Sequence, residues 1–147
     1  MTKKRQIKVN YEAMAEFRYA IRKFLSFSQQ SAYAAGLEPR QYQALLALKG
    51  YPKHRKPTIG ALAEQLQIRH HTAVELASRL QKNGLVRRTR SPQDRRQVLV
   101  RLARKGERVL ERLALTHRAE LQTAGPGLIK ALEKIVGGAG RKARGAA

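Results

Sequence analysis

The sequence contains no cysteine among its 147 residues, which excludes disulfide bonds, thiol redox centres, cysteine-based zinc sites and cysteine nucleophiles. It also lacks any apolar run close to the ~20 residues that a membrane-spanning helix needs. No apolar signal core follows the basic residues 1–8. We therefore expect a cytoplasmic protein without a membrane-spanning segment.

Acidic residues are scarce as well. The chain has 10 Asp and Glu against 31 Lys and Arg, which gives a formal net charge of +21. An excess of this size indicates a polyanionic partner, namely DNA, RNA or an anionic membrane surface.

Patterns typical of catalysis and metal binding are missing too. There is no Gly-rich phosphate loop and no pairing of a nucleophile with a base, so we expect neither catalytic residues nor a cofactor, and no enzyme. His70 and His71 are adjacent, and neighbours on a helix point about 100° apart. No metal site is therefore expected.

Apolar residues recur at helical spacing through most of the chain, which predicts a mainly α-helical protein. Residues 1–9 are expected to form a basic flexible arm. Asn10 and Thr58 are suitable N-caps, and Pro39 suits a first helical turn. Four helices are predicted before residue 84, over residues 10–36, 39–50, 58–66 and 70–83.

The pattern changes after Gly84, where residues 85–90 and 98–102 predict two strands around the turn residues 91–94. A further helix is expected from Gly106. The run Gly125-Pro126-Gly127 predicts a break before a last helix that ends near Val136. Residues 137–147 are rich in Gly, Ala and basic residues, and we expect a disordered tail there.

Residues 58–102 combine two short helices, a link of about four residues and a hairpin, which is the pattern of a winged helix-turn-helix. In the second helix, Ala73, Leu76, Ala77 and Leu80 share an apolar face that packs inward. The opposite face would meet base edges if this helix entered a major groove, and it carries His71, Val74, Glu75 and Ser78.

Basic residues concentrate around this helix and the hairpin. From Arg69 to Lys105 there are eleven Lys or Arg and only two acids, Glu75 and Asp94. The hairpin arginines are predicted to contact DNA, the alternative being a solvated hairpin. Asp94 either caps the turn or orients an arginine, and both roles are compatible.

The stretch TIGALAEQLQIRHHTAVELASRLQKNGLVRRTRSPQDRRQVLVRLARKGERVLERL resembles the MarR (multiple antibiotic resistance regulator) family. Its clearest parts are LAEQL, TAVELASRLQKNGLVRR and DRRQVLVRLARKG. The resemblance implies a single domain over residues 10–136 and a homodimer on a pseudo-palindromic duplex. Residues 10–36 and 106–136 would be the dimerisation helices, and residues 37–105 the winged helix-turn-helix region that binds DNA.

The resemblance also implies particular site residues. Thr72 and Ser78 are similar to recognition-helix contacts, whereas Val74 and Glu75 depart from the family pattern. The full set predicted on the recognition helix is His70, His71, Thr72, Val74, Glu75, Ser78 and Arg79. The set predicted on the wing is Arg87, Arg88, Arg90, Asp94, Arg95 and Arg96. A small aromatic or phenolic effector is implied by relatives, and its candidate pocket residues are Tyr19, Tyr33 and Tyr42.

Several alternatives remain open at this point. The stripe Met14, Phe17, Ile21 and Phe24 belongs to a core or a dimer interface rather than to the lining of a ligand pocket. His117 is a packed histidine, an interface histidine or a sensor. The protein is expected to be a ligand-responsive repressor. The competing classes are a constitutive or architectural DNA-binding protein and an RNA-binding protein, against which the scarcity of stacking aromatics argues.

Overall fold

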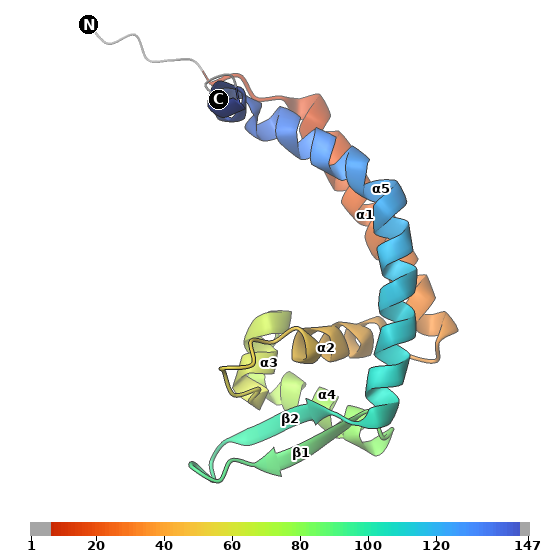
Figure 1. The fold of residues 1–147 in the computed structure, drawn as a ribbon, viewed down its shortest axis with the longest axis vertical. Coiled ribbons are helices and arrows are strands. Elements are labelled where there is room, and N and C mark those ends of the chain that lie inside the picture. The colour runs from red at the N-terminus through yellow and green to blue at the C-terminus, as the bar shows by residue number, and fades with distance from the viewer. Residues whose placement is uncertain (1–6, 145–147) are drawn as a thin grey trace, which may run out of the picture. The chain divides into compact units, whose positions relative to one another are not determined.

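A computed structural model gives the fold (Figure 1); it describes residues 7–144, and the side chains of residues 7–137. Within this part of the chain, five helices and one antiparallel hairpin follow each other. Their order is α1 (Tyr11–Ala34), α2 (Pro39–Lys49), α3 (Ile59–Leu66), α4 (His70–Lys82), β1 (Val86–Arg90), β2 (Val98–Leu102) and α5 (Arg104–Arg144). The prediction of a mainly α-helical protein with a small β-hairpin is confirmed.

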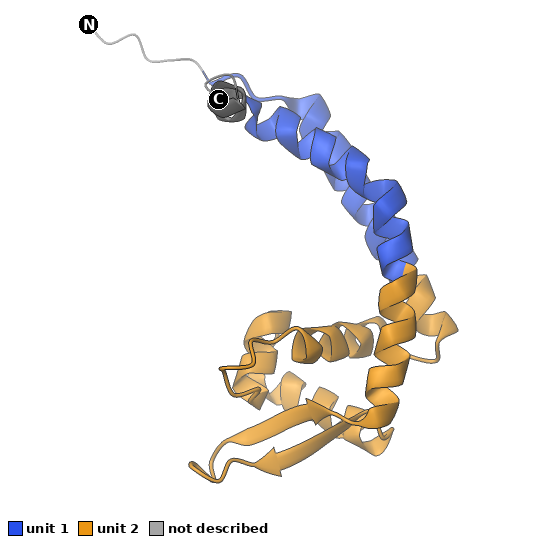
Figure 2. Ribbon diagram, viewed as in Figure 1, with its two compact units in different colours: residues 1–28, 117–147 blue, residues 29–116 orange. Residues whose placement is uncertain are grey.

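The chain divides into two compact units (Figure 2). Residues 29–116 form one, here called the winged-helix unit. Residues 1–28 and 117–147 form the other, here called the helix-pair unit. The predicted arm and tail lie partly outside the described residues, which exclude residues 1–6 and 145–147.

Predicted capping residues begin the helices. The Asn10 side-chain oxygen accepts a hydrogen bond from the Ala13 amide at 3.0 Å, and Thr58 Oγ1 accepts one from the Ala61 amide at 3.0 Å. Each cap satisfies one of the amides that a helix start leaves without an intrahelical partner. Gly84 stops α4 at a φ of 74°, a left-handed conformation that glycine adopts without steric cost.

The winged-helix unit has a continuous apolar core. Leu45, Leu62, Leu80 and Val100 are fully or almost fully buried in it. The hairpin aligns Val86 with Leu102 on this inner side. The Val100 amide donates to the Pro57 carbonyl at 2.8 Å, and a bridge pairs Thr58 with Leu99, so the start of α3 is fixed to the wing.

Helix α5 runs unbroken from Arg104 to Arg144 with Pro126 inside it, so the predicted break at residues 125–127 is wrong. The predicted disordered tail also differs from the structure, because residues 137–144 continue the helix. Proline removes one backbone hydrogen bond from a helix. Contacts with α1 lie on both sides of Pro126, at His117 and at Lys134, and these tertiary contacts maintain the helix.

The helix-pair unit has a narrow contact between α1 and α5. His117 is buried and lies edge-on to the rings of Phe24 and Phe27, with Nε2 2.8 Å from Ser28 Oγ. Lys134 Nζ lies 3.8 Å from a carboxylate oxygen of Glu16. His117 is thus a packed histidine. Among the described residues, no helix has the length and apolar character required to cross a membrane.

Candidate nucleic-acid interface

Helix α4 has the two-sided character predicted for a recognition helix. Ala73, Leu76, Ala77 and Leu80 are buried on its inner side. The opposite side is exposed and includes Val74, an apolar residue with 38% of its surface accessible. Other exposed members of the predicted set are His70, His71, Glu75, Ser78 and Arg79, whereas Thr72 is half-buried.

The start of α4 has no side-chain cap. Arg69 is the N-cap residue in an extended conformation, and its side chain makes no capping hydrogen bond. The exposed imidazoles of His70 and His71 therefore occupy a helix N-terminus, whose partial positive charge favours an anionic group. This end of the helix has the chemistry of a phosphate contact.

Gln81 joins the recognition helix to the wing. Its Oε1 accepts hydrogen bonds from the Arg88 amide at 3.0 Å and from Arg88 Nε at 2.9 Å. Sequence analysis missed this residue because the contact depends on how the hairpin folds back along α4. The signal available was its place on the exposed side of the helix, three residues after Ser78.

The wing turn orders two arginines. Asp94 Oδ1 accepts from the Arg96 amide at 3.1 Å and from Arg96 Nε at 3.3 Å, so one oxygen both closes the turn and holds the arginine. The Arg96 side chain is 92% exposed, and an exposed ion pair contributes at most about 1 kcal/mol. The contact therefore positions Arg96 more than it stabilises the fold. Arg90 similarly donates to the Arg95 carbonyl at 2.9 Å.

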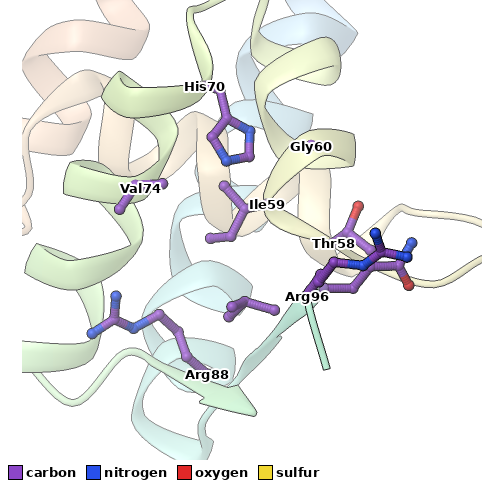
Figure 3. A pocket seen from close by; sticks show the side chains of 9 residues that line it. Thr58, Ile59, Gly60, His70, Val74, Arg88 and Arg96 are labelled. Atoms are coloured by element: carbon purple, nitrogen blue, oxygen red, sulfur yellow. The ribbon is translucent and has the colours of Figure 1, made fainter. Parts of the chain in front are cut away.

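Recognition helix, wing and the start of α3 surround a groove of about 290 Å³ (Figure 3). The structure brings four of the predicted residues together there: His70, Val74, Arg88 and Arg96. In Figure 3 the Arg88 guanidinium extends from β1 toward the helix that carries Val74. The remaining lining residues are Thr58, Ile59, Gly60, Gln97 and Val98. The groove thus combines two arginines with an apolar wall.

Arg87 does not belong to this groove, because successive side chains of a strand point to opposite faces. Arg88 is paired with the buried Val100, whereas Arg87 is paired with the exposed Arg101 on the other face. The wing arginines predicted as one set are therefore divided between two surfaces.

The three tyrosines predicted to line an effector pocket differ in their surroundings. Tyr42 is buried in the core of the winged-helix unit, and burial raises the pKa of its phenol above 10.0. Tyr33 is 64% exposed, and Tyr19 is 62% exposed with Lys23 Nζ 5.2 Å from its ring centroid. Among the described residues, no three His, Asp or Glu side chains gather closely enough to hold a metal ion.

Two short helices, of which the second has an exposed face, are followed by a hairpin that carries arginines and contacts the second helix. This arrangement defines a winged helix-turn-helix protein. Residues 35–97 match the model of the MarR family. Over 63 residues the chain is 40% identical to the uncharacterized HTH-type transcriptional regulator YsmB of Bacillus subtilis (strain 168). This match spans 43% of the chain and 42% of that relative, which is less than half of either protein.

Solved structures with the same fold extend over more of the chain. A MarR family protein from Bacillus stearothermophilus is 26% identical, with a TM-score of 0.67 over 79% of this chain and 81% of that one. AbsC, a MarR family transcriptional regulator from Streptomyces coelicolor, is 18% identical, with a TM-score of 0.70 over 95% of this chain and 99% of that one. The winged-helix region is therefore similar to the MarR family, and the solved structures share the fold of the chain.

Proposed function

We propose that the protein is a transcriptional regulator that binds a pseudo-palindromic operator in double-stranded DNA as a homodimer. The observation that carries the proposal is the groove between α4 and the wing, which Arg88, Arg96 and the exposed Val74 line together. Base edges in a major groove are read by such a helix, and arginines beside it bind phosphates or enter the minor groove. MepR of S. aureus, a structural neighbour at 18% identity, is solved as a mutant bound to an oligodeoxyribonucleotide.

Two residues are expected to set an uncommon base preference. Val74 places methyl groups on the exposed side of α4 and suits a thymine methyl. Glu75 is exposed one residue further and is suited to accept a hydrogen bond from a cytosine amino group. The adjacent wing would act differently, since Arg96, held by Asp94, would bind the phosphate backbone or enter the minor groove.

The dimer is proposed from the apolar surface of the helix-pair unit. Ile129, Leu132 and Val136 are 60%, 45% and 58% exposed, and their spacing puts them along one stripe of α5. A second copy would cover such a stripe. Two-fold symmetry would then separate the two recognition helices by about one turn of DNA, roughly 34–36 Å.

Repression is proposed to respond to a small aromatic or phenolic compound. CouR of Rhodococcus jostii RHA1, a structural neighbour at 20% identity, is solved with bound p-coumaroyl-CoA. In the winged-helix unit of this chain, a cavity of about 470 Å³ lies between the end of α1 and the first turns of α5. Its volume is within the range of small-molecule pockets, and Arg112 in its lining suits an anionic ligand. A constitutive DNA-binding protein is the competing proposal, which the net charge of +21 favours.

Selection of duplexes from a random library by the full chain, followed by footprinting on its own promoter, tests sequence-specific binding. We expect one enriched palindrome. Glu75→Gln should change the preferred base at one position of each half-site, whereas Arg96→Gln should weaken all duplexes alike by about tenfold. Gln65→Ala, an exposed residue of α3, is the control. Equal affinity of the wild-type chain for every duplex would refute an operator and favour the architectural alternative.

A further inference from the structure

The wing has a second charged face that the groove beside α4 does not use. On the inner face, Val86, Val100 and Leu102 join the core. On the outer face, the hairpin register sets Arg87 directly opposite Arg101, and both side chains are exposed. The two arginines are therefore cross-strand neighbours on the hairpin face opposite the one that carries Val86, Val100 and Leu102.

Placing these two arginines opposite each other is unfavourable in the isolated protein. Directly opposite side chains on one sheet face have Cβ atoms roughly 4.5–5.5 Å apart, and like charges at this distance destabilise the pair. None of the ion pairs seen between residues 7 and 137 includes Arg87 or Arg101. An anion lying over the pair would remove the repulsion.

Arg101 also lines a cavity of about 310 Å³ beneath the loop between α2 and α3. Lys53 and Arg55 of this loop line the same cavity, and its apolar floor comes from Leu48, Tyr51, Pro52 and Pro57. Residues 51–57 contain no acid. Three cations thus surround one hollow next to the Arg87–Arg101 pair.

The loop is held in place before any ligand arrives. The Arg55 amide donates to the Pro52 carbonyl at 3.0 Å, and the Pro57 carbonyl accepts from Val100 of the wing at 2.8 Å. Lys56 Nζ reaches Gln93 Oε1 in the wing turn at 3.2 Å. Because these hydrogen bonds already fix the backbone of the loop, the loop loses little conformational entropy when an anion binds.

We propose that Lys53, Arg55, Arg87 and Arg101 form a second phosphate-binding surface, here called the outer wing patch. Its ligand is the sugar–phosphate backbone of duplex DNA, in the part of the duplex just beyond the segment that the wing contacts. Arginine binds phosphate oxygens through two parallel hydrogen bonds, and the contact of Lys56 with the wing turn makes the patch continuous with the wing. The proposal rests on the DNA binding proposed above and extends its footprint.

The test compares two duplexes, one limited to the selected operator and one with about ten additional base pairs on each side. We expect the wild-type chain to bind the longer duplex more tightly, with a steeper dependence on salt. In Lys53→Gln/Arg55→Gln/Arg101→Gln, this advantage should disappear. The slope of the logarithm of affinity for the longer duplex against the logarithm of salt concentration should decrease in magnitude. We expect a decrease of about one for each phosphate that a subunit of this variant no longer neutralises. Affinity for the short duplex should stay within about twofold.

Arg40→Gln is the matched control, because Arg40 is an exposed cation of α2 outside the patch. It should retain the advantage of the longer duplex. Arg101→Gln alone should raise the melting temperature of the free protein while weakening binding to the longer duplex, because it relieves the repulsion from Arg87. A lower melting temperature of this variant would show that Arg101 is structural and would overturn the proposal.

Further outcomes distinguish the possible sources of phosphate. They also separate failure of the outer wing patch from failure of the proposed operator binding. Equal wild-type affinity for both duplexes overturns the outer wing patch, while the operator itself remains supported by the short duplex. If inorganic phosphate or pyrophosphate binds the wild type but not the triple variant, and duplex length has no effect, the site takes a free phosphate compound. A patch-dependent preference for structured RNA over duplex DNA would likewise overturn the assignment to DNA.

Discussion

The two units of the molecule differ in how they bury apolar surface. The winged-helix unit encloses a core that includes Leu45, Leu62 and Leu80. In the described part of the helix-pair unit, the buried residues are only Ala13, Ala131 and His117. Many of its large apolar side chains are exposed instead, among them Tyr11, Met14, Leu25, Leu121, Ile129, Leu132 and Val136.

This difference in burial indicates that the two units are stabilised in different ways, one within a single chain and the other through assembly. A helix that packs in a protein hides its apolar stripe, because helical propensity alone seldom stabilises an isolated helix. The winged-helix unit meets this requirement within one chain. The helix-pair unit does not, and we infer that its stability depends on a second copy.

Two glycines provide the largest expected contrast between the units. A Cβ at Gly106, in the first turn of α5, would collide with the backbone carbonyl of Leu85. A Cβ at Gly127 in the helix-pair unit would have no neighbour within 4 Å. Gly106→Ala should therefore lower the free energy of unfolding by about 3 kcal/mol or more. Gly127→Ala should raise it by about 0.5–1 kcal/mol, since alanine favours a helix.

Urea unfolding followed by circular dichroism measures both variants under one set of conditions. The two substitutions add the same methyl group, so they differ only in the space around it. Similar free energies for both would contradict the close packing of α5 on Leu85.

Local signals explain why sequence analysis located several helix ends correctly. Asn10 and Thr58 cap helices within three residues of themselves, and Gly84 ends α4 by its own backbone conformation. The break expected at Pro126 was wrong because contacts more than 80 residues away in sequence, such as His117 with Ser28, maintain the helix.

The candidate site was predictable by residue type but not by arrangement. Arg87, Arg88 and Arg90 were predicted together from their charge and from their place on a hairpin that follows a helix-turn-helix. Alternation along the strand separates Arg87 from Arg88 and Arg90, but only the register of the hairpin shows that Arg87 stands opposite Arg101. The contact of Gln81 with Arg88 likewise depends on tertiary structure, which no local pattern encodes.

An acidic residue in the apolar stripe of α5 should give the next largest effect. We expect the wild-type chain to be a dimer. Ile129→Asp should raise the dissociation constant of the dimer about a hundredfold, which corresponds to about 2.7 kcal/mol of binding free energy. The reason is that the new carboxylate would be desolvated at the interface. Sedimentation equilibrium measures this constant. Gln122→Asp adds the same charge at an exposed polar position of α5 and should leave the dimer unchanged. A wild-type monomer at micromolar concentration would contradict the inferred assembly.

The smallest effect concerns alkaline pH and tests the core of the winged-helix unit. Burial raises the pKa of Tyr42 above 10.0, so the neutral phenol is favoured in the folded state. Its contribution to stability is fully present below pH 10 and is lost as pH rises through the pKa of the folded state. Tyr42→Phe should therefore flatten the fall in unfolding free energy above pH 10, measured by urea unfolding at pH 8 to 11. An unchanged slope in Tyr42→Phe would contradict the burial of this phenol in the core of the winged-helix unit.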